Sequence, residues 1–212
     1  MFPFPFSFVA PTASGLADID NVYSMEFDGV NDYILINDSP FDTALASTQF
    51  SASFWYYTDN AALAFIWSQD FNSQFELYTS AVGWYAYIGG DVAWLPSRPP
   101  IITGKWVHVA VIVDQDPTTG GVTMHQTDNT GTNVYTSAPR LAISNPSSTP
   151  LYIGRRDNST FYFEGKLDEF AIFDYGLDSD QVQEIYNATS SGKTADLSAM
   201  ATPPIALYRM GD

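Results

Sequence analysis

Hydrophobic and polar positions alternate along this chain in short stretches that turn residues separate. The clearest stretch is residues 106–113, whose four valines at positions 107, 109, 111 and 113 fall on one face of an extended strand. Similar strands are predicted at residues 22–27, 33–36, 50–57, 63–68, 75–79, 84–88, 92–95, 122–126 and 132–136. Many short strands at regular spacing predict an all-β fold, a two-sheet antiparallel sandwich.

One further strand leads into the only predicted helix. Its two faces are predicted to carry Gly165, Leu167, Glu169, Ala171 and Phe173 on one side and Lys166, Asp168, Phe170 and Ile172 on the other. Asp178 then offers an N-cap, with Gln181 at the capping-box position. Apolar residues follow at helical spacing, namely Val182, Ile185 and Tyr186. These signals predict a short helix over residues 178–187, packed at the edge of the sandwich.

Four sequence motifs occur in a fixed order. They are SMEFDGVNDY at residues 24–33, GKWVHVA at 104–110, LYIG at 151–154 and FEGKLDEF at 163–170, followed by IYN at 185–187. Together they resemble the LamG-like jelly rolls of the concanavalin A-like lectin/glucanase superfamily. The resemblance covers about residues 22–190 and implies a jelly-roll sandwich with one short C-terminal helix. It implies a function only loosely, because one fold carries many functions.

The ends of the chain differ in character from its middle. We expect residues 1–21 to form an extended arm, residues 22–192 the sandwich and residues 193–212 a linker or docking tail. The arm is either a loose leader or a docking peptide that places four phenylalanines in a partner: Phe2, Phe4, Phe6 and Phe8. In the tail, Leu207 and Tyr208 are either part of a docking strand or a vestige of a following module.

Composition excludes several classes of function. The chain has 24 acidic and 8 basic residues and a net charge of −16, which argues against binding nucleic acid or an anionic membrane. It has no cysteine, so disulfides and thiolate zinc sites are excluded and a bacterial or viral source is favoured. The apolar N-terminus lacks a basic region and contains prolines, unlike a signal peptide. No stretch is long enough to span a membrane.

Catalysis is not predicted. Relatives in the same superfold that cleave β-glucans place carboxylates on one face of a strand, across the scissile bond. Here Asp168 and Glu169 are adjacent, so an extended strand points them to opposite faces. His108 lies in a predicted central strand and is interpreted as a hydrogen-bonded structural residue, while His125 is isolated. We therefore expect no enzyme activity.

The resemblance also implies a structural Ca²⁺ ion where the first hairpin meets the closing strand. The matching positions are Asp28 and Asp168, assisted by backbone carbonyls near Gly29. The alternative is that Asp28 only caps a turn and Asp168 accepts hydrogen bonds from the backbone.

A sugar-binding surface needs aromatic side chains beside polar ones. The candidates are Trp84, Tyr85, Tyr87 and Trp94, although alternation requires one face of each strand to be buried in the core. Trp94, next to a proline, is the candidate most expected to be exposed.

Taken together, these features favour a virion surface protein of a bacteriophage, either a capsid decoration protein or a tail-fibre adhesin. Its partners would be other virion proteins and host surface glycans, and it would form a homo-oligomer in the assembly. The alternative is a secreted bacterial carbohydrate-binding or adhesion module, extracellular or on the cell surface, with the arms serving as linkers.

Overall fold

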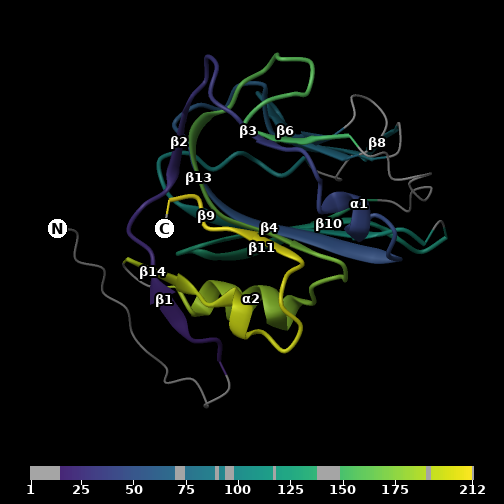
Figure 1. Cartoon of the computed structure of the whole chain (residues 1–212), viewed down its shortest axis with the longest axis vertical. Helices are drawn as coiled ribbons and strands as arrows, with labels where there is room; N and C mark the ends of the chain where they lie inside the picture. The colour runs from purple at the N-terminus through teal and green to yellow at the C-terminus, as the bar shows by residue number, and fades with distance from the viewer. Residues whose placement is uncertain are drawn as a thin grey trace.

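Two antiparallel sheets pack face to face, and a helix with a small third sheet lies outside one of them (Figure 1). The computed structural model describes residues 15–69, 75–88, 91–93, 98–116, 118–137, 149–189 and 192–211. The predicted all-β jelly-roll sandwich is confirmed.

The seven-stranded sheet forms the middle layer of the molecule. Its strands are, in spatial order, β11 (Gly131–Thr136), β10 (Gly121–Asp128), β9 (Val107–Asp114), β4 (Gln49–Tyr57), β13 (Glu164–Phe173) and β15 (Ala206–Tyr208), with β2 (Met25–Asp28) also paired to β13. The predicted valine face of β9 is confirmed, and the alternate apolar residues of β4 enter the same core.

The six-stranded sheet forms the other wall of the sandwich. Its strands are, in order, β3 (Ile34–Ile36), β12 (Leu151–Ile153), β5 (Ala64–Gln69), β6 (Phe75–Ser80), β7 (Gly83–Ile88) and β8 (Asp91–Ala93). Aromatic rings fill the space between the sheets, with Trp67 in edge contact with Phe54 and Phe170 at 5.6 and 5.4 Å. A one-turn helix that the sequence did not predict, α1 (Phe41–Ala44), inserts Phe41 into the same cluster.

A bulge in β13 changes the predicted faces of that strand. The pairing of β13 with β4 shifts between Asp168 and Ala171, and Glu169 adopts a positive φ of 49°. As a result Leu167 and Phe170 both face the core between the sheets, whereas strict alternation would place them on opposite faces. Ala171 faces the other way, toward the helix.

Helix α2 (Ser179–Asn187) begins where the sequence predicted. Asp178 and Gln181 form a complete capping box, with the Asp178 carboxylate accepting from the Gln181 backbone N–H at 2.8 Å. Val182 and Ile185 are buried against Phe173 and neighbouring residues of the seven-stranded sheet. The helix thus covers the outer face of that sheet, as Figure 1 shows. Its predicted position at the edge of the sandwich is therefore wrong.

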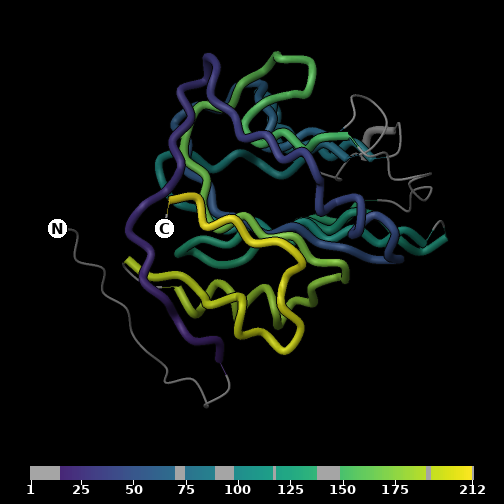
Figure 2. The backbone as a smooth tube through the Cα atoms, in the orientation of Figure 1, coloured from purple at the N-terminus to yellow at the C-terminus, as the bar shows by residue number. Residues whose placement is uncertain are grey.

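Both terminal segments belong to the folded domain, which corrects the predicted boundaries. The strand β1 (Asp18–Asp20) pairs with β14 (Lys193–Ala195), and a 3₁₀ turn, η1 (Leu197–Ala199), leads on toward β15 at the edge of the seven-stranded sheet. Figure 2 shows the first and last described segments side by side. Residues 193–208 are therefore not a free tail, and the arm predicted over 1–21 already pairs at residue 18.

The predicted docking residues of the tail have partners inside the domain. Tyr208 packs on the Phe170 ring at 6.3 Å, and Leu207 packs against the cluster beneath α2. Both residues therefore contribute to the packing of the domain while remaining partly exposed, and docking through them stays a prediction. The predicted docking residues Phe2, Phe4, Phe6 and Phe8 lie outside the described residues. Among the helices that are described, none has the length and apolar character needed to cross a membrane.

Candidate functional site

The outer face of the six-stranded sheet is the sheet surface that no described helix or strand covers. In Figure 1 this sheet lies at the top, opposite the layer formed by α2, β1 and β14. Among the described residues, the segment between β12 and β13 arches over part of it. The side chains on this face come from alternate residues of β6 and β7, whose intervening residues point into the core. In β5 a bulge places both Ile66 and Trp67 in the core, so its outward residues, Phe65 and Ser68, are three apart.

The strand register aligns the outward side chains in two rows across the sheet. One row is Tyr152, Ser68, Glu76 and Tyr87, from β12, β5, β6 and β7. The other is Phe65, Tyr78 and Tyr85, from β5, β6 and β7. With a strand spacing of about 4.8 Å, the first row extends for about 14 Å. The face therefore places a polar row beside an aromatic one.

The aromatic row is a continuous stack of rings. Phe65 stacks on Tyr78 with 4.8 Å between ring centroids, and Tyr78 stacks on Tyr85 at 5.0 Å and an interplanar angle of 5°. Phe161, which is 42% exposed, extends the stack beyond Phe65. The Arg98 guanidinium lies 5.7 Å from the Tyr85 ring at the other end. Tyr78 is half-buried, so the centre of the row also reaches the surface.

The centre of the polar row is a buried carboxylate with fixed partners. Glu76 accepts from the Ser68 hydroxyl at 2.9 Å and from the Arg156 Nε at 3.2 Å. Burial raises the pKa of Glu76 above its usual value, against the opposing effect of the hydrogen bonds from Arg156 and Ser68. The Arg156 guanidinium also lies 4.9 Å from the Phe65 ring, so it joins the two rows.

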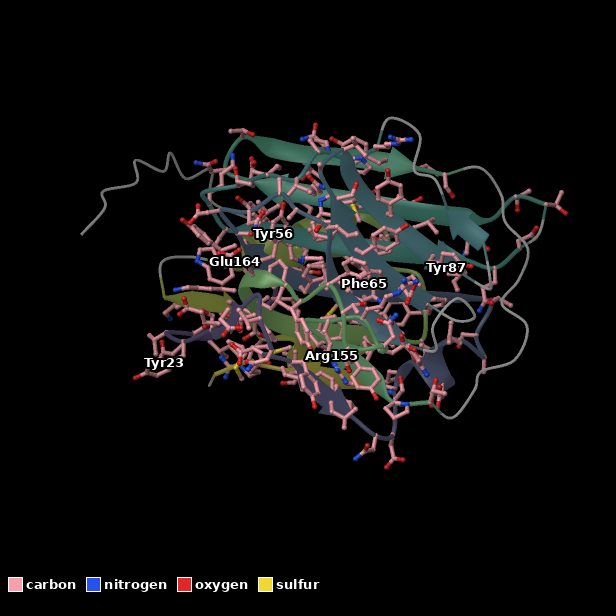
Figure 3. The ribbon with its side chains drawn as sticks, turned by 90° about the horizontal axis from the view of Figure 1, so that it is seen from above. Tyr23, Tyr56, Phe65, Tyr87, Arg155 and Glu164 are labelled. Carbon is pink, nitrogen blue, oxygen red and sulfur yellow. The ribbon has the colours of Figure 1, made fainter. Side chains whose placement is uncertain are left out.

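A second arginine lies at the β3–β12 end of the face. The Arg155 guanidinium is 3.9 Å from the Tyr33 ring centroid and 4.4 Å from that of Tyr152, and these two rings are 6.2 Å from each other, so it packs in the corner that they form. Figure 3 looks onto this side of the molecule and shows Phe65, Tyr87 and Arg155 spread across it.

The segment that carries both arginines is tightly held. Gly154 donates its backbone N–H to Ile66 in β5, and Phe65 donates to the Phe161 carbonyl on the far side of the segment. Within it, the Arg156 N–H donates to Thr160, closing a turn. Both guanidinium groups therefore rest on a fixed backbone.

The predicted sugar-binding residues lie in three different places. Trp84 is fully buried in the core, with its ring 5.2 Å from that of Tyr56, so the structure corrects its assignment as a surface residue. Tyr85 and Tyr87 lie on the outer face as components of the two rows. Trp94 lies outside the described residues.

Most of this surface was not predicted from the sequence, which did not point to five of its residues as possible ligand contacts: Phe65, Tyr78, Glu76, Arg155 and Arg156. The available signal was Glu76 and Tyr78 at alternate positions of residues 75–79, together with an Arg-Arg pair directly after the LYIG motif.

A pocket elsewhere on the molecule has a different lining. It lies beside α1, with a volume of about 340 Å³, and is lined by Asn37, Asp38, Ser39, Pro40, Asp42, Thr43 and Ile205. No aromatic residue lines it, so it offers no surface on which a sugar ring could stack.

The predicted calcium ligands are not brought together. Asp28 lies opposite Glu164 in the pairing of β2 with β13, and Asp168 is four residues further along that strand, about 13 Å away at about 3.3 Å per residue. The Asp28 carboxylate accepts from the backbone N–H groups of Val30 and Asn31, which lowers its pKa. No group of three or more acidic or histidine side chains suited to a metal occurs among the described residues. The pair therefore does not fit a shared ion, and calcium binding stays a prediction.

The other candidate groups are structural. His108 is fully buried, exchanges a hydrogen bond with the Ser53 hydroxyl at 2.8 Å, and has a pKa lowered to about 3 by burial. Asp168 accepts from the Glu169 backbone N–H, and the Glu169 carboxylate accepts from Asn21 and Arg209. These interactions hold the two adjacent carboxylates within the fold.

Comparison with known proteins agrees with the architecture. The model of the family described as the concanavalin A-like lectin/glucanases superfamily matches residues 28–183, well over half of the chain. The chain belongs to the concanavalin A-like lectin/glucanase superfamily. No curated protein matches it.

Several solved structures of this superfamily fold are similar to the chain. A candidate carbohydrate-binding protein from Bacteroides ovatus aligns with a TM-score of 0.60 at 15% identity, over 92% of this chain and 52% of that one. Domain 4 of an extracellular arabinanase from Geobacillus stearothermophilus, in complex with arabinotriose, aligns at 0.53 and 17% identity, over 81% of each chain. The sialidase CBM40 of Ruminococcus gnavus bound to α2,3-sialyllactose aligns at 0.52 and 14% identity, over 80% and 97%.

These similarities support the fold but identify no specific ligand for this chain. The chain spans about half the length of the Bacteroides ovatus protein, and every identity is below one fifth. Structural neighbours of this lectin-like chain include carbohydrate-binding modules and a laminin G region. At these identities the similarity shows the fold alone.

Proposed function

We propose that this chain is a non-catalytic glycan-binding module, and that the outer face of the six-stranded sheet is its binding surface. The observation that carries the proposal is the juxtaposition of two rows on that face. The stacked rings of Phe65, Tyr78 and Tyr85 run beside the polar centre formed by Glu76 and Arg156.

The two rows suit the two kinds of surface that a sugar presents. The apolar C–H face of a sugar ring packs on an aromatic ring, which buries apolar area. Its hydroxyls need charged or polar partners in fixed positions. Because Glu76 is fully buried, it does not reach a ligand; it holds the Arg156 guanidinium, whose side chain remains 17% exposed, in place.

Catalysis is not part of this proposal. The adjacent carboxylates Asp168 and Glu169 are both buried, and Glu169 is engaged by residues of the terminal segments. A glycosidase instead needs two carboxylates facing each other across the bond that is cleaved.

The comparisons favour the secreted module over the virion protein. Carbohydrate-binding proteins are among the structural neighbours, whereas no feature of the described residues points to a capsid or tail partner. We accordingly propose an extracellular or cell-surface location with glycans as partners. A virion location and a homo-oligomer stay predictions; sedimentation velocity of the purified protein tests the second.

The test is a glycan array followed by calorimetric titration with the best ligand. Tyr78→Ala and Phe161→Ala each remove one ring of the stack, and each should weaken binding about tenfold, the loss expected for one ring contact. Trp106→Ala serves as the matched control, because this 38% exposed tryptophan lies next to β9 in the other sheet.

The outcomes are distinct. Circular dichroism and melting temperature first establish that each variant is folded. Equal affinities of the wild type, Tyr78→Ala and Phe161→Ala would place the glycan elsewhere on the molecule. Failure of the folded wild type to bind any glycan on a broad array would refute the proposed function itself.

A further inference from the structure

Arg155 lacks the acidic partner that most cations of the described residues have. Lys105, Arg156, Lys166, Lys193 and Arg209 each form an ion pair with an aspartate or glutamate. Arg155 forms no ion pair with any described residue, although the chain contains 24 acidic residues. An unpaired guanidinium is unexpected in so acidic a chain.

Arg155 is also buried. Only 7% of the residue is exposed, and its Nε has no hydrogen-bond partner among the described residues. Nη1 donates to the Ser159 hydroxyl. Holding a charge away from water without a counter-ion costs free energy. Packing against Tyr33 and Tyr152 offsets only part of this cost, because cation–π contacts are weak compared with the desolvation of a charge.

The N–H groups of the guanidinium define where an additional partner can bind. The ring centroids of Tyr33 and Tyr152 are 6.2 Å apart, so the two rings form adjacent sides of a corner around Arg155 and do not cover opposite faces. Any further hydrogen bond is donated from the edge of the guanidinium, because its N–H groups lie in its plane. That edge presents the paired N–H groups that match a carboxylate in a bidentate arrangement. Tyr33, which is 45% exposed, forms the outer wall, so this side of the corner reaches solvent.

The stack is continuous with the proposed glycan surface. Tyr152 is both a wall of the Arg155 stack and the first member of the polar row, directly opposite Ser68. A glycan lying along the polar row would therefore bring its terminal residue to Arg155.

We propose that Arg155 binds the carboxylate of an acidic sugar residue, with Tyr33 and Tyr152 packing beside it. This inference rests on the proposed glycan-binding function and names the class of glycan. The net charge of −16 repels an acidic sugar at long range, so selectivity must come from contact with this guanidinium.

The test compares acidic probes with uncharged counterparts of the same size on the wild-type protein. One arm uses α2,3-sialyllactose against lactose, and the other uses oligogalacturonate against its methyl ester. We expect one acidic probe to bind at least about tenfold more tightly than its counterpart, the increment of one charge-assisted hydrogen-bond pair. The arm that shows the preference identifies the source of the carboxylate.

Two variants assign the preference to Arg155. Arg155→Lys keeps the charge but removes the planar edge, and it should reduce the acidic preference to near unity. Lys166→Gln is the matched control, since it removes one positive charge from the other sheet and should leave the preference intact. If Arg155→Lys does not fold, Tyr33→Leu removes the exposed outer wall instead and should weaken the acidic probe alone.

The outcomes separate this inference from the proposed function. If neutral glycans bind and no acidic probe is preferred, the acidic class is wrong while the glycan-binding function stands. A preference that persists in both Arg155→Lys and Tyr33→Leu assigns the carboxylate to another residue and overturns the role of Arg155. If no glycan of either kind binds, both proposals fail.

Discussion

Glu169 connects both terminal segments to the bulge of β13, and its replacement is the most informative test of the fold. Its side chain is 4% exposed, and its Oε1 accepts from Asn21 Nδ2 at 3.0 Å and from Arg209 Nε at 3.1 Å. Asn21 precedes the sandwich and Arg209 follows β15, so one carboxylate fixes two distant parts of the chain.

Glu169→Ala should destabilise the fold by about 2 kcal/mol. Breaking a fully buried ion pair costs about 3–5 kcal/mol, because the remaining charge has no partner. The loss here should be smaller for two reasons. Arg209 has a side chain that is 28% exposed and keeps its bond to the Asp20 carbonyl, and burial already raises the pKa of Glu169, so ionisation of this carboxyl is disfavoured in the fold.

Two further replacements of Glu169 separate the cost of its backbone conformation from the cost of losing its carboxylate. Glu169 has a φ of 49°, a left-handed conformation that costs an L-residue about 1–2 kcal/mol and glycine almost nothing. Glu169→Gly should therefore be less destabilising than Glu169→Ala by about 1 kcal/mol. Glu169→Gln keeps an acceptor for Arg209 and should cost the least.

Urea denaturation measures these differences, with stability taken from the midpoint at a constant m-value. Glu26→Ala is the control, since the Glu26 side chain is 74% exposed and its ion pair with Lys166 spans 3.8 Å. It should leave the midpoint unchanged. If Glu169→Ala matches this control, the terminal segments do not depend on the carboxylate and the reasoning is wrong.

The remaining predictions concern other parts of the fold. His108 has a pKa of about 3 in the folded protein and about 6.5 in the unfolded chain, so its contribution to stability is complete above pH 6.5 and is lost on acidification. By pH 5 the free energy of unfolding of the wild type should fall by about 2 kcal/mol. His108→Gln should not show this decrease, and urea midpoints measure the difference. Asp178→Ala removes the capping box and should cost about 1 kcal/mol in a thermal melt. Gly154→Ala should destabilise by at least about 1 kcal/mol, because at φ 88° its Cβ would lie 2.4 Å from the Phe27 ring. Because Asp28 and Asp168 do not share an ion, Asp28→Asn should leave any effect of calcium chelation on the melting temperature unchanged, and loss of that effect in the variant would contradict the placement of Asp28.

Local periodicity predicted most of the strands and one helix of this fold. Val107 and Val109 enter the core as their spacing requires, and Asp178 caps α2 with Gln181. These signals depend only on residues close in sequence. The bulge at Glu169 breaks the same rule, because one residue of β13 leaves the ladder and the side chains after it change faces. Nothing in the alternation of residues 165–173 reveals where that shift occurs.

The tail was misread because its strands are too short to show a period. β14 and β15 have three residues each, and Pro203 and Pro204 between them are typical of a linker. Their place in the fold depends on partners elsewhere in the chain, namely β1 and the middle of β13. Pairing over such separations is decided by tertiary contacts that a window of neighbouring residues does not contain.

The residues of the candidate binding surface were also hard to predict, because their exposure depends on tertiary contacts. Alternation places Trp84 and Tyr85 on opposite faces of β7, but it does not tell which face is buried until the sheets are packed together. The stack at Arg155 is harder still, since Tyr33 precedes β3 while Tyr152 lies more than a hundred residues later in β12. The conspicuous motifs mark residues that build the sandwich, such as Gly154 and Phe163. Ligand specificity, by our proposal, depends on arginines beside those motifs, whose surroundings only the folded chain defines.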